Sequence, residues 1–420
     1  MGKNNKKIAT ALSLGLAYQY IKSDENQRFK IFNMFSNKNN NTNNNREDNI
    51  KMGIILGFTG PIESLTPAMA ASAELAFKEA SDSGSLLGGK KIEVIRADST
   101  CVDSAAATAA AEKLISEGVV AIMGADCSGV TGAMASNVAV PNGVVMISPS
   151  ATSPGLTTID DNGYFFRTAP SDARGGQVLA DITKDRKVKS VAITYTNNDY
   201  GRGLADVYAA AVKAHGIKVT TVTAHEDGKA DYSSEVATLA SEGGDAVAVI
   251  GYIDQGGKGI IQASLDLGAF DTFILSDGMI GDSLTDTFGK SLNKSFGCLP
   301  GSLAKGADQF AKVASAGGID SSGPYTGESY DAAALIVLAM HAGNSIERAS
   351  IAKNIMEVAN GPGTKIYPGE LKKGLDLLAK GKKINYEGAT GVTFTSVGEA
   401  EGSFLEKEVK GGKFKTKKQR

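Results

Sequence analysis

Short hydrophobic runs rich in β-branched residues alternate with longer Ala-rich segments along most of the chain, beginning near Ile50. Residues 53–58 form the first run, and Thr66-Pro67 then supplies an N-cap and a proline suited to the first turn of a helix. This alternation is typical of parallel βαβ units whose sheet carries helices on both faces. Two series are predicted: strands over 53–58, 91–97, 119–123 and 143–147 with helices over 66–80, 104–117 and 129–138, then strands over 190–195, 218–223, 246–250 and 271–276 with helices over 173–184, 203–215, 233–242 and 258–267.

The pattern turns helical again after Gly301, and two late strands follow at 389–395 and 403–409. The helices predicted over 306–316, 327–343, 350–358 and 371–379 have no sheet of their own, so we expect them to return and cover an earlier lobe. The predicted fold is therefore α/β, with two doubly wound parallel-sheet lobes and several crossings between them. A cleft between such lobes, at the carboxyl ends of the strands, is a usual place for a small ligand.

The first fifty residues follow a different pattern, with twelve Asn and no apolar periodicity that could offset the entropy of ordering. We predict a disordered spacer over residues 18–49. Residues 1–17 place Lys3, Lys6 and Lys7 before a short apolar run, which indicates a weak export signal; an unstructured N-terminus is the alternative. No later stretch reaches the roughly 18 apolar residues of a membrane span, so we expect none in the mature chain.

Charge and composition exclude several classes of function. The chain holds 44 Lys or Arg and 46 Asp or Glu, so it lacks the basic excess that nucleic acid binding needs, and nucleic acid is not an expected partner. Eight Lys or Arg and four Asp or Glu lie in the first 49 residues, which leaves a net charge of −6 for residues 50–420. Three His, three Cys and no Trp leave few ligands for a metal or a catalytic triad.

The one segment that resembles a catalytic motif does not have the surroundings that the motif needs. Residues 84–90 fit the first seven positions of a phosphate-binding loop, but Lys91 stands where Ser or Thr should bind magnesium. The segment also runs from a helix into a strand, whereas phosphate binding needs a strand that leads into a helix. No pair of His has metal-ligand spacing, and the Cys residues form no CxxC. We therefore expect no catalysis, no metal and no cofactor.

The cysteines suggest a disulfide. Cys101 follows the second predicted strand and Cys127 the third, so neighbouring parallel strands bring both to one rim of the cleft. Pairing them would close a loop of about 25 residues and contribute about 3 kcal/mol. Such a bond persists in an oxidising compartment such as the periplasm. Two buried reduced thiols are the alternative, and we expect Cys298 to be an unpaired, small apolar residue.

Polar side chains gather where the predicted strands end. Ser128 stands at the start of a helix, where free N–H groups favour an anion such as a carboxylate, and residues 148–154 add hydroxyls one strand later. Tyr200, Tyr252 and Asp277 follow strands of the second lobe and should face the same cleft. A carboxylate anchor on one wall and an acid on the other fit a zwitterion such as an amino acid. Taken singly, each is more often a cap or turn residue.

Several segments share their order and spacing with a known family. They are residues 57–62 (GFTGPI), 98–101 (DSTC), 127–128 (CS), 147–154 (ISPSATSP), 165–168 (FFRT), 197–205 (NNDYGRGLA) and 231–233 (DYS). From Ile50 onward the chain resembles the type I periplasmic solute-binding proteins of branched-chain amino acid ABC importers, the leucine/isoleucine/valine-binding group. The resemblance implies a periplasmic protein that closes around an amino acid and delivers it to a membrane permease, as a monomer.

The resemblance also assigns roles to particular residues. It implies a ligand carboxylate site at Ser128, Ser150 and Thr152 with the backbone of Ala151, an ammonium-binding acid at Asp277, closing aromatics at Tyr200 and Tyr252, and a Cys101–Cys127 disulfide. It implies three lobe crossings, so we expect lobe 1 over residues 50–170 and 300–399 and lobe 2 over 171–299 and 400–413. Residues 414–420 are rich in Lys, and we expect a basic tail there.

Three positions depart from the family pattern. The ammonium-binding acid, often Glu in that group, is the shorter Asp277, and Leu65 stands where a pocket aromatic is common. Asp126 falls where an apolar wall residue can occur, and a buried carboxylate there would disfavour an aliphatic ligand unless it is paired. The identity of the amino acid or amide therefore stays open. A ligand-sensing domain of the same fold, feeding a receptor or regulator, is the alternative function.

Overall fold

The computed structural model describes residues 49–420, and residues Ile50–Arg420 form one compact unit. The expected export signal, residues 1–17, and nearly all of the spacer expected over 18–49 lie outside the described residues. Within the described range, every helix is too short or too polar to cross a lipid bilayer.

The first lobe is built on a five-stranded, fully parallel sheet with the strand order β2-β1-β3-β4-β5. Its interior strands β1 and β3 are hydrophobic and buried except at Lys51, because helices cover both faces of the sheet. The elements up to the first crossing are β1 (Ile50–Leu56), α3 (Thr66–Asp82), β2 (Ile92–Asp98), α4 (Ser104–Ser116), β3 (Ala121–Gly124), α5 (Ser128–Met134), β4 (Val145–Ser148) and β5 (Phe165–Arg167), with short η1 (Leu86–Gly88), η2 (Ala135–Ala139) and η3 (Pro154–Thr158).

The second lobe repeats the same strand order. Its parallel strands run β7-β6-β8-β9-β10, and β13 and β14 extend the sheet in antiparallel fashion to seven strands. This order places a switch point between the first and third strand of each lobe, where ligands of open α/β sheets bind. The elements are α6 (Asp172–Asp185), β6 (Ser190–Thr196), α7 (Asp199–Ala214), β7 (Lys218–His225), α8 (Ser233–Glu242), β8 (Ala246–Ile250), α9 (Gly256–Leu267), β9 (Phe273–Leu275), η4 (Asp277–Met279), α10 (Asp282–Phe288), η5 (Gly289–Leu292), β10 (Phe296–Pro300), β13 (Phe404–Lys410) and β14 (Lys413–Gln419).

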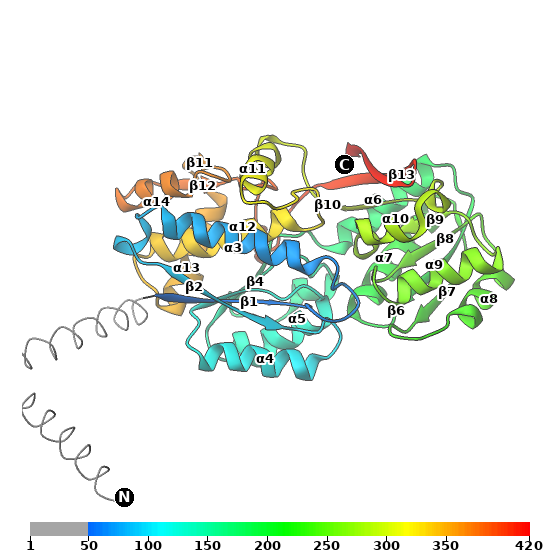
Figure 1. Ribbon diagram of the computed structural model, residues 1–420, viewed down its shortest axis with the longest axis horizontal. Coiled ribbons are helices and arrows are strands. Elements are labelled where there is room, and N and C mark those ends of the chain that lie inside the picture. Colours follow the sequence, from blue (N-terminus) through cyan, green and yellow to red (C-terminus); the bar gives the residue numbers. More distant parts are fainter. Residues whose placement is uncertain (1–48) are drawn as a thin grey trace, which may run out of the picture. The chain divides into compact units, whose positions relative to one another are not determined.

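The later helices return to the first lobe, as the sequence predicts (Figure 1). Helix α12 (Thr326–Ala342) packs against α3, and 15 of its 17 residues are buried because the helix is apolar on nearly all sides. The other returning elements are α11 (Lys305–Ala316), α13 (Arg348–Asn360), α14 (Leu371–Ala379) and the two-stranded sheet of β11 (Thr364–Ile366) and β12 (Ile384–Tyr386). The chain thus crosses between the lobes three times, after β5, after β10 and before β13.

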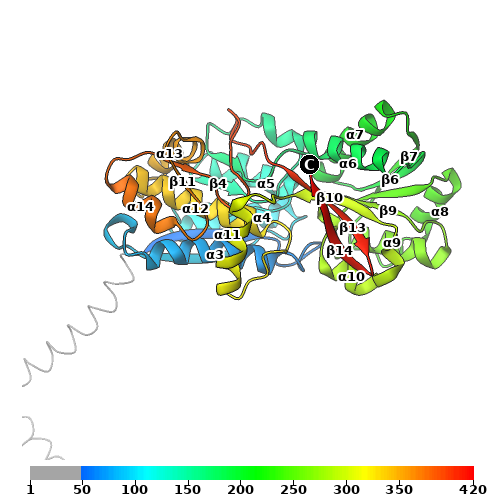
Figure 2. The same ribbon diagram turned by 90° about the horizontal axis from the view of Figure 1, so that it is seen from above.

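The C-terminal region differs from the expectation in two places. No strand forms over 389–395 among the described residues; Phe394 and Ala400 form only an isolated bridge. Residues 414–420, expected as a basic tail, mostly belong to β14, which pairs with β13 at the edge of the second sheet (Figure 2). The segment has little hydrophobic alternation, so the backbone hydrogen bonds of an antiparallel hairpin determine its structure.

The structure confirms the expected disulfide, which joins Cys101 after β2 to Cys127 after β3. Their Cα atoms lie 5.1 Å apart, and both residues are buried. Cys298 in β10 is a buried free thiol. The bond therefore ties the ends of β2 and β3 together across β1. The two strands are not neighbours, contrary to the expectation from the sequence, because β1 lies between them and pairs with both.

Removing the disulfide should lower the free energy of unfolding by about 3 kcal/mol, because the bond links residues 26 positions apart and so reduces the conformational entropy of the unfolded chain. Urea denaturation of the Cys101→Ser/Cys127→Ser variant measures this. Reductant should destabilise the wild type by a similar amount and leave the double variant unchanged. If the wild type and the double variant unfold at the same urea concentration, the bond contributes no stability.

Candidate functional site

A cavity between the two lobes lies at the carboxyl ends of their strands. It encloses about 360 Å³ of empty space, part of it open to solvent. Seven of the nine predicted ligand-binding residues line it. These are Leu65, Asp126, Ser128, Ser150, Tyr200, Tyr252 and Asp277.

Asp277 lies at the centre of the second lobe's wall of this cavity. It begins η4, directly after β9, and only 7% of its surface is exposed. Its Oδ1 lies 2.7 Å from the Tyr200 hydroxyl, and its Oδ2 accepts a hydrogen bond from the Tyr325 hydroxyl. Burial raises the pKa of Asp277, and the two phenol hydrogen bonds lower it in part. The carboxylate is thus held by neutral donors, and it forms no ion pair within residues 49–420.

The surrounding tyrosines form one packed group. Tyr200 and Tyr252 stack with ring centroids 5.2 Å apart, and the Tyr200 hydroxyl also lies 2.9 Å from Ser276 Oγ. Burial raises the pKa values of Tyr200, Tyr252 and Tyr325 well above the ordinary value, so all three remain neutral phenols. They supply hydrogen bonds and aromatic surface without charge.

A second buried acid lies behind Asp277. Asp172, the first residue of α6, shares a small cavity with Asp277, Ser276 and Cys298. Burial raises the pKa of Asp172 well above its ordinary value, and the negative charge of Asp277 raises it further. Both effects favour the neutral form of Asp172.

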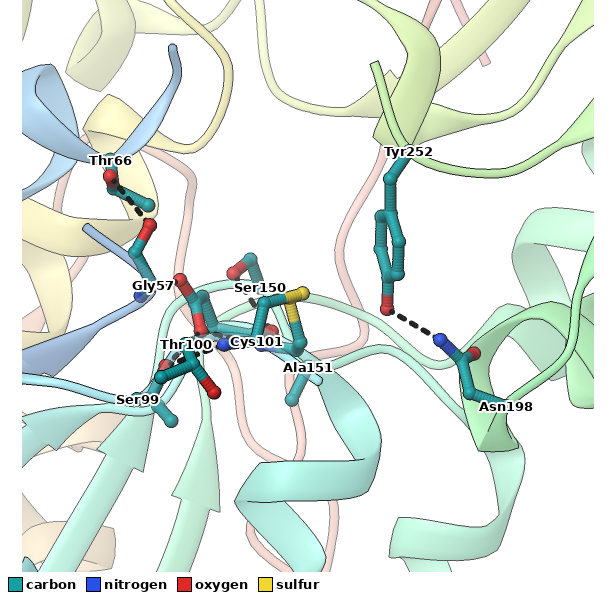
Figure 3. The surroundings of a disulfide bond; sticks show 12 residues. Gly57, Thr66, Ser99, Thr100, Cys101, Ser150, Ala151, Asn198 and Tyr252 are labelled. Atoms are coloured by element: carbon teal, nitrogen blue, oxygen red, sulfur yellow. Dashed lines mark hydrogen bonds between the residues drawn. A yellow bond between two sulfur atoms is a disulfide. The ribbon is translucent and has the colours of Figure 1, made fainter. Parts of the chain in front are cut away.

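The first lobe's polar wall is formed by Ser128 and Ser150. Ser128 Oγ accepts a hydrogen bond from the Ser153 backbone N–H at 3.1 Å, and Ser150 Oγ donates to the Asp126 carbonyl at 3.1 Å. These contacts fix both hydroxyls at the cavity surface. In Figure 3 Ser150 and the disulfide lie across from Tyr252, whose hydroxyl is 3.4 Å from Asn198 Nδ2.

Ala151 and Thr152 lie behind this wall and not at its surface. Both are buried, and neither lines the cavity. The Ala151 N–H donates to Ser148 Oγ at 2.9 Å, and its carbonyl accepts from Arg167 at 3.1 Å. Both backbone groups of Ala151 therefore already have protein partners.

Arg167 fixes the turn after β4, which carries Ser150 and Ala151, through hydrogen bonds to its backbone. Its side chain is 1% exposed; Nη1 donates to the carbonyls of Ala151 and Ser153, while Nη2 donates to Thr157 Oγ1 and lies 2.6 Å from Glu399 Oε2. The guanidinium fork suits several acceptors at fixed angles. One buried cation thus links the serine-bearing turn to the chain segment that leads into β13.

Asp126 lines the cavity, but its oxygens are occupied by the protein. Oδ2 accepts from the Gly57 N–H at 2.5 Å, and Oδ1 accepts from Ser99 Oγ at 3.0 Å and from the Cys127 N–H at 2.8 Å. Burial raises its pKa, and these three hydrogen bonds oppose the shift. The carboxyl group is paired, so it does not exclude an aliphatic ligand.

Five further residues line the cavity: Ile62, Met69, Cys127, Gly278 and Tyr325. Cys127 was expected only in the disulfide, and Gly278 follows the predicted Asp277. Ile62 and Met69 join Leu65 in an apolar wall from the β1–α3 connection and α3, and Tyr325 precedes α12. An aromatic residue in the Gly323-Pro324-Tyr325 turn, just before the helix that returns to the first lobe, was the available signal for Tyr325. Ile62 and Met69 resemble ordinary core positions in sequence.

The lobes also contact each other at the rim of the cavity. The Ser64 N–H donates to Asp254 Oδ2 at 2.8 Å, and the Asp254 N–H donates to the Pro61 carbonyl at 2.9 Å. Ser64 and Ser283 hydroxyls lie 3.2 Å apart. The structure therefore shows the two lobes in contact around the site.

The two lobes have the same strand order, the chain crosses between them three times, and both lobes line the cavity. These features define a two-lobed protein that binds a small molecule. A sequence model of the periplasmic binding protein family matches residues 49–367. Leu/Ile/Val-binding protein homolog 1 of Brucella melitensis is 30% identical over 318 residues, which cover 74% of this chain and 82% of that protein. The chain belongs to the periplasmic binding protein family.

Other relatives match over shorter spans or in fold alone. Leu/Ile/Val-binding protein homolog 3 of Brucella melitensis is 31% identical, but the alignment covers 50% of this chain and only 56% of that protein. The crystal structure of the branched-chain amino acid transporter substrate binding protein LivJ from Streptococcus pneumoniae, in complex with isoleucine, superposes with a TM-score of 0.73 at 21% identity. It covers 89% of this chain and 99% of that one, and the two share the same fold.

Replacing Arg167 by Met should lower the free energy of unfolding by about 3–5 kcal/mol, because buried carbonyls and Glu399 lose their cation. Arg96→Met is the matched control: Arg96 also pairs with a glutamate, Glu74, but its side chain is 45% exposed, so we expect a loss of about 0–1 kcal/mol. Urea denaturation compares the two. Equal losses would show that Arg167 has no special structural role.

Proposed function

We propose that this protein captures an amino acid between its lobes outside the cytoplasm and delivers it to the permease of an ABC importer. The observation that carries the proposal is that the two lobes present opposite kinds of polar group to one cavity. A charged acid, Asp277, faces the hydroxyl of Ser128 across one cavity, and this hydroxyl accepts from the Ser153 N–H and keeps its own proton for a ligand, whereas Ser150 already donates to the Asp126 carbonyl. A zwitterion needs an acceptor for its ammonium group and donors for its carboxylate, and this cavity offers one on each lobe.

The remaining wall favours an aliphatic side chain. Ile62, Leu65 and Met69 present apolar surface, and the one carboxyl group among them, Asp126, is occupied by three protein donors. Apolar surface binds an aliphatic group through the hydrophobic effect. The names of the Leu/Ile/Val-binding relatives and the isoleucine in the LivJ complex agree with this preference.

Ligand binding would stabilise the closed arrangement of the lobes. Ser128 and Ser150 belong to the first lobe and Asp277 to the second, so one ligand contacts both only when they approach each other. A ligand shifts an equilibrium toward the state that it binds more tightly. We propose that the permease recognises this closed form, that the protein acts in the periplasm, and that it releases its ligand unchanged.

Asp277→Asn should weaken amino acid binding at least about 30-fold, because the ammonium group loses its charged partner. Asp172→Asn is the matched control: Asp172 is a buried acid that does not line the cavity, and the amide has a similar shape, so affinity should stay within about threefold. Calorimetric titration with leucine, isoleucine, valine and a polar and a cationic amino acid measures both. Unchanged affinity in Asp277→Asn would overturn the zwitterion assignment.

Binding should also weaken as the pH falls. The ammonium group needs ionised Asp277, and burial raises the pKa of this carboxyl above the ordinary aspartate value. Affinity is therefore complete above the raised pKa and is lost as the pH falls through it, by about tenfold for each further pH unit. Titrations in acidic and neutral buffers test this. A midpoint at or below the ordinary aspartate pKa would contradict it.

A further inference from the structure

The C-terminal hairpin, β13 with β14, carries a charge opposite to that of the rest of the folded unit. Residues 404–420 contain seven Lys or Arg and two Glu, whereas residues 50–403 contain 29 Lys or Arg and 40 Asp or Glu. The hairpin lies beyond residues 49–367, which the family model matches. A cationic segment on an otherwise anionic protein can bind a negatively charged partner.

The positive charge is exposed and only partly paired. Lys410, Lys413, Lys415, Lys417 and Lys418 are all exposed. Lys413 pairs with Asp286 and Lys417 with Glu406, but Lys410, Lys415 and Lys418 form no ion pair within residues 49–420.

The two glutamates of the hairpin do not offset this charge at the surface. Glu406 is fully buried and contacts Arg186 and Arg420, and Glu408 also contacts Arg186. Arg186 and Arg420 thus neutralise both acids. Lys418 and Lys415 are the strand partners of Glu406 and Glu408, but both stay exposed without an ion pair among residues 49–420 and are available for another partner.

The hairpin lies at an edge of the second sheet, where β14 pairs only with β13 (Figure 2). Its exposed positions are Lys, Thr, Gln and Gly. Of the six exposed large hydrophobic side chains of residues 49–420, Leu303 lies beside the hairpin, because its N–H donates to Gln419 Oε1 at 2.6 Å. The edge thus offers charge and little apolar surface for a peptide. Its lysines also repel a second copy of the same strand.

We propose that this hairpin docks on an anionic lipid surface. Lipid headgroups present many negative charges in one plane and need no side-chain pocket, which suits an exposed row of lysines. This inference rests on the proposed function in one respect: a protein that serves a membrane importer works beside a bilayer. Docking would keep the protein near the importer's membrane.

The test is cosedimentation of the full chain with vesicles of phosphatidylglycerol and phosphatidylcholine in equal parts, at low ionic strength. The wild type should bind these vesicles, should not bind pure phosphatidylcholine, and should be released by salt. Lys415→Gln/Lys418→Gln should weaken binding about 25-fold, or about fivefold for each lysine removed.

The matched control is Lys213→Gln/Lys218→Gln. Lys213, in the last turn of α7, and Lys218, the first residue of β7, are exposed and form no ion pair in the described part of the chain. β7 is the opposite edge strand of the same sheet. This variant should bind vesicles like the wild type. An equal loss in both variants would overturn the proposal, as would binding to polyglutamate without binding to vesicles.

The proposed function is checked separately on the same variants. Both double variants should bind amino acid with unchanged affinity in calorimetry, because the lysines lie outside the cavity. If the wild type binds amino acid normally but does not bind vesicles, the docking proposal alone is overturned. Vesicle binding that persists without amino acid binding would overturn the proposed function alone.

Discussion

The buried guanidinium of Arg167 is the constraint on which the first lobe's part of the site depends. It donates to the carbonyls of Ala151 and Ser153 and pairs with Glu399. A cation in the interior is stable only when acceptors surround it in the right geometry. The turn between β4 and β5 therefore has one conformation, and the segment that leads into β13 is fixed to it. The first lobe then acts as a rigid wall with positioned hydroxyls.

Three buried aspartates serve different purposes because their surroundings differ. Asp126 is occupied by three protein donors and holds the ends of β1, β2 and β3 together. Asp172 lies beside another acid, and its pKa rises well above the ordinary value. Asp277 receives hydrogen bonds from two phenols and faces the cavity. Asp126 and Asp277 both line the cavity, but three protein donors already occupy the oxygens of Asp126, so burial alone would not have distinguished the two.

The sequence predicts those features of the site that follow from the order of strands and helices along the chain. Residues at the ends of parallel strands meet at one edge of a sheet, which is why Ser128, Ser150 and Asp277 were expected together and line one cavity. Tyr325 could not be placed in this way, because it reaches the cavity only through the return of α12 to the first lobe. The burial of Ala151 depends on a long-range contact with Arg167 and has no local signal.

The contacts between the lobes suggest how a ligand could control closure. The rim hydrogen bonds of Ser64 and Asp254 are exposed to solvent, and each such bond contributes only about 0.5–1.5 kcal/mol. The Tyr325 bond to Asp277 is buried, but the same carboxylate is also the proposed ammonium partner. Closure without ligand is thus weakly favoured at best, whereas a zwitterion that contacts both walls adds charged hydrogen bonds on each side. Its greater affinity for the closed state makes closure dependent on the ligand.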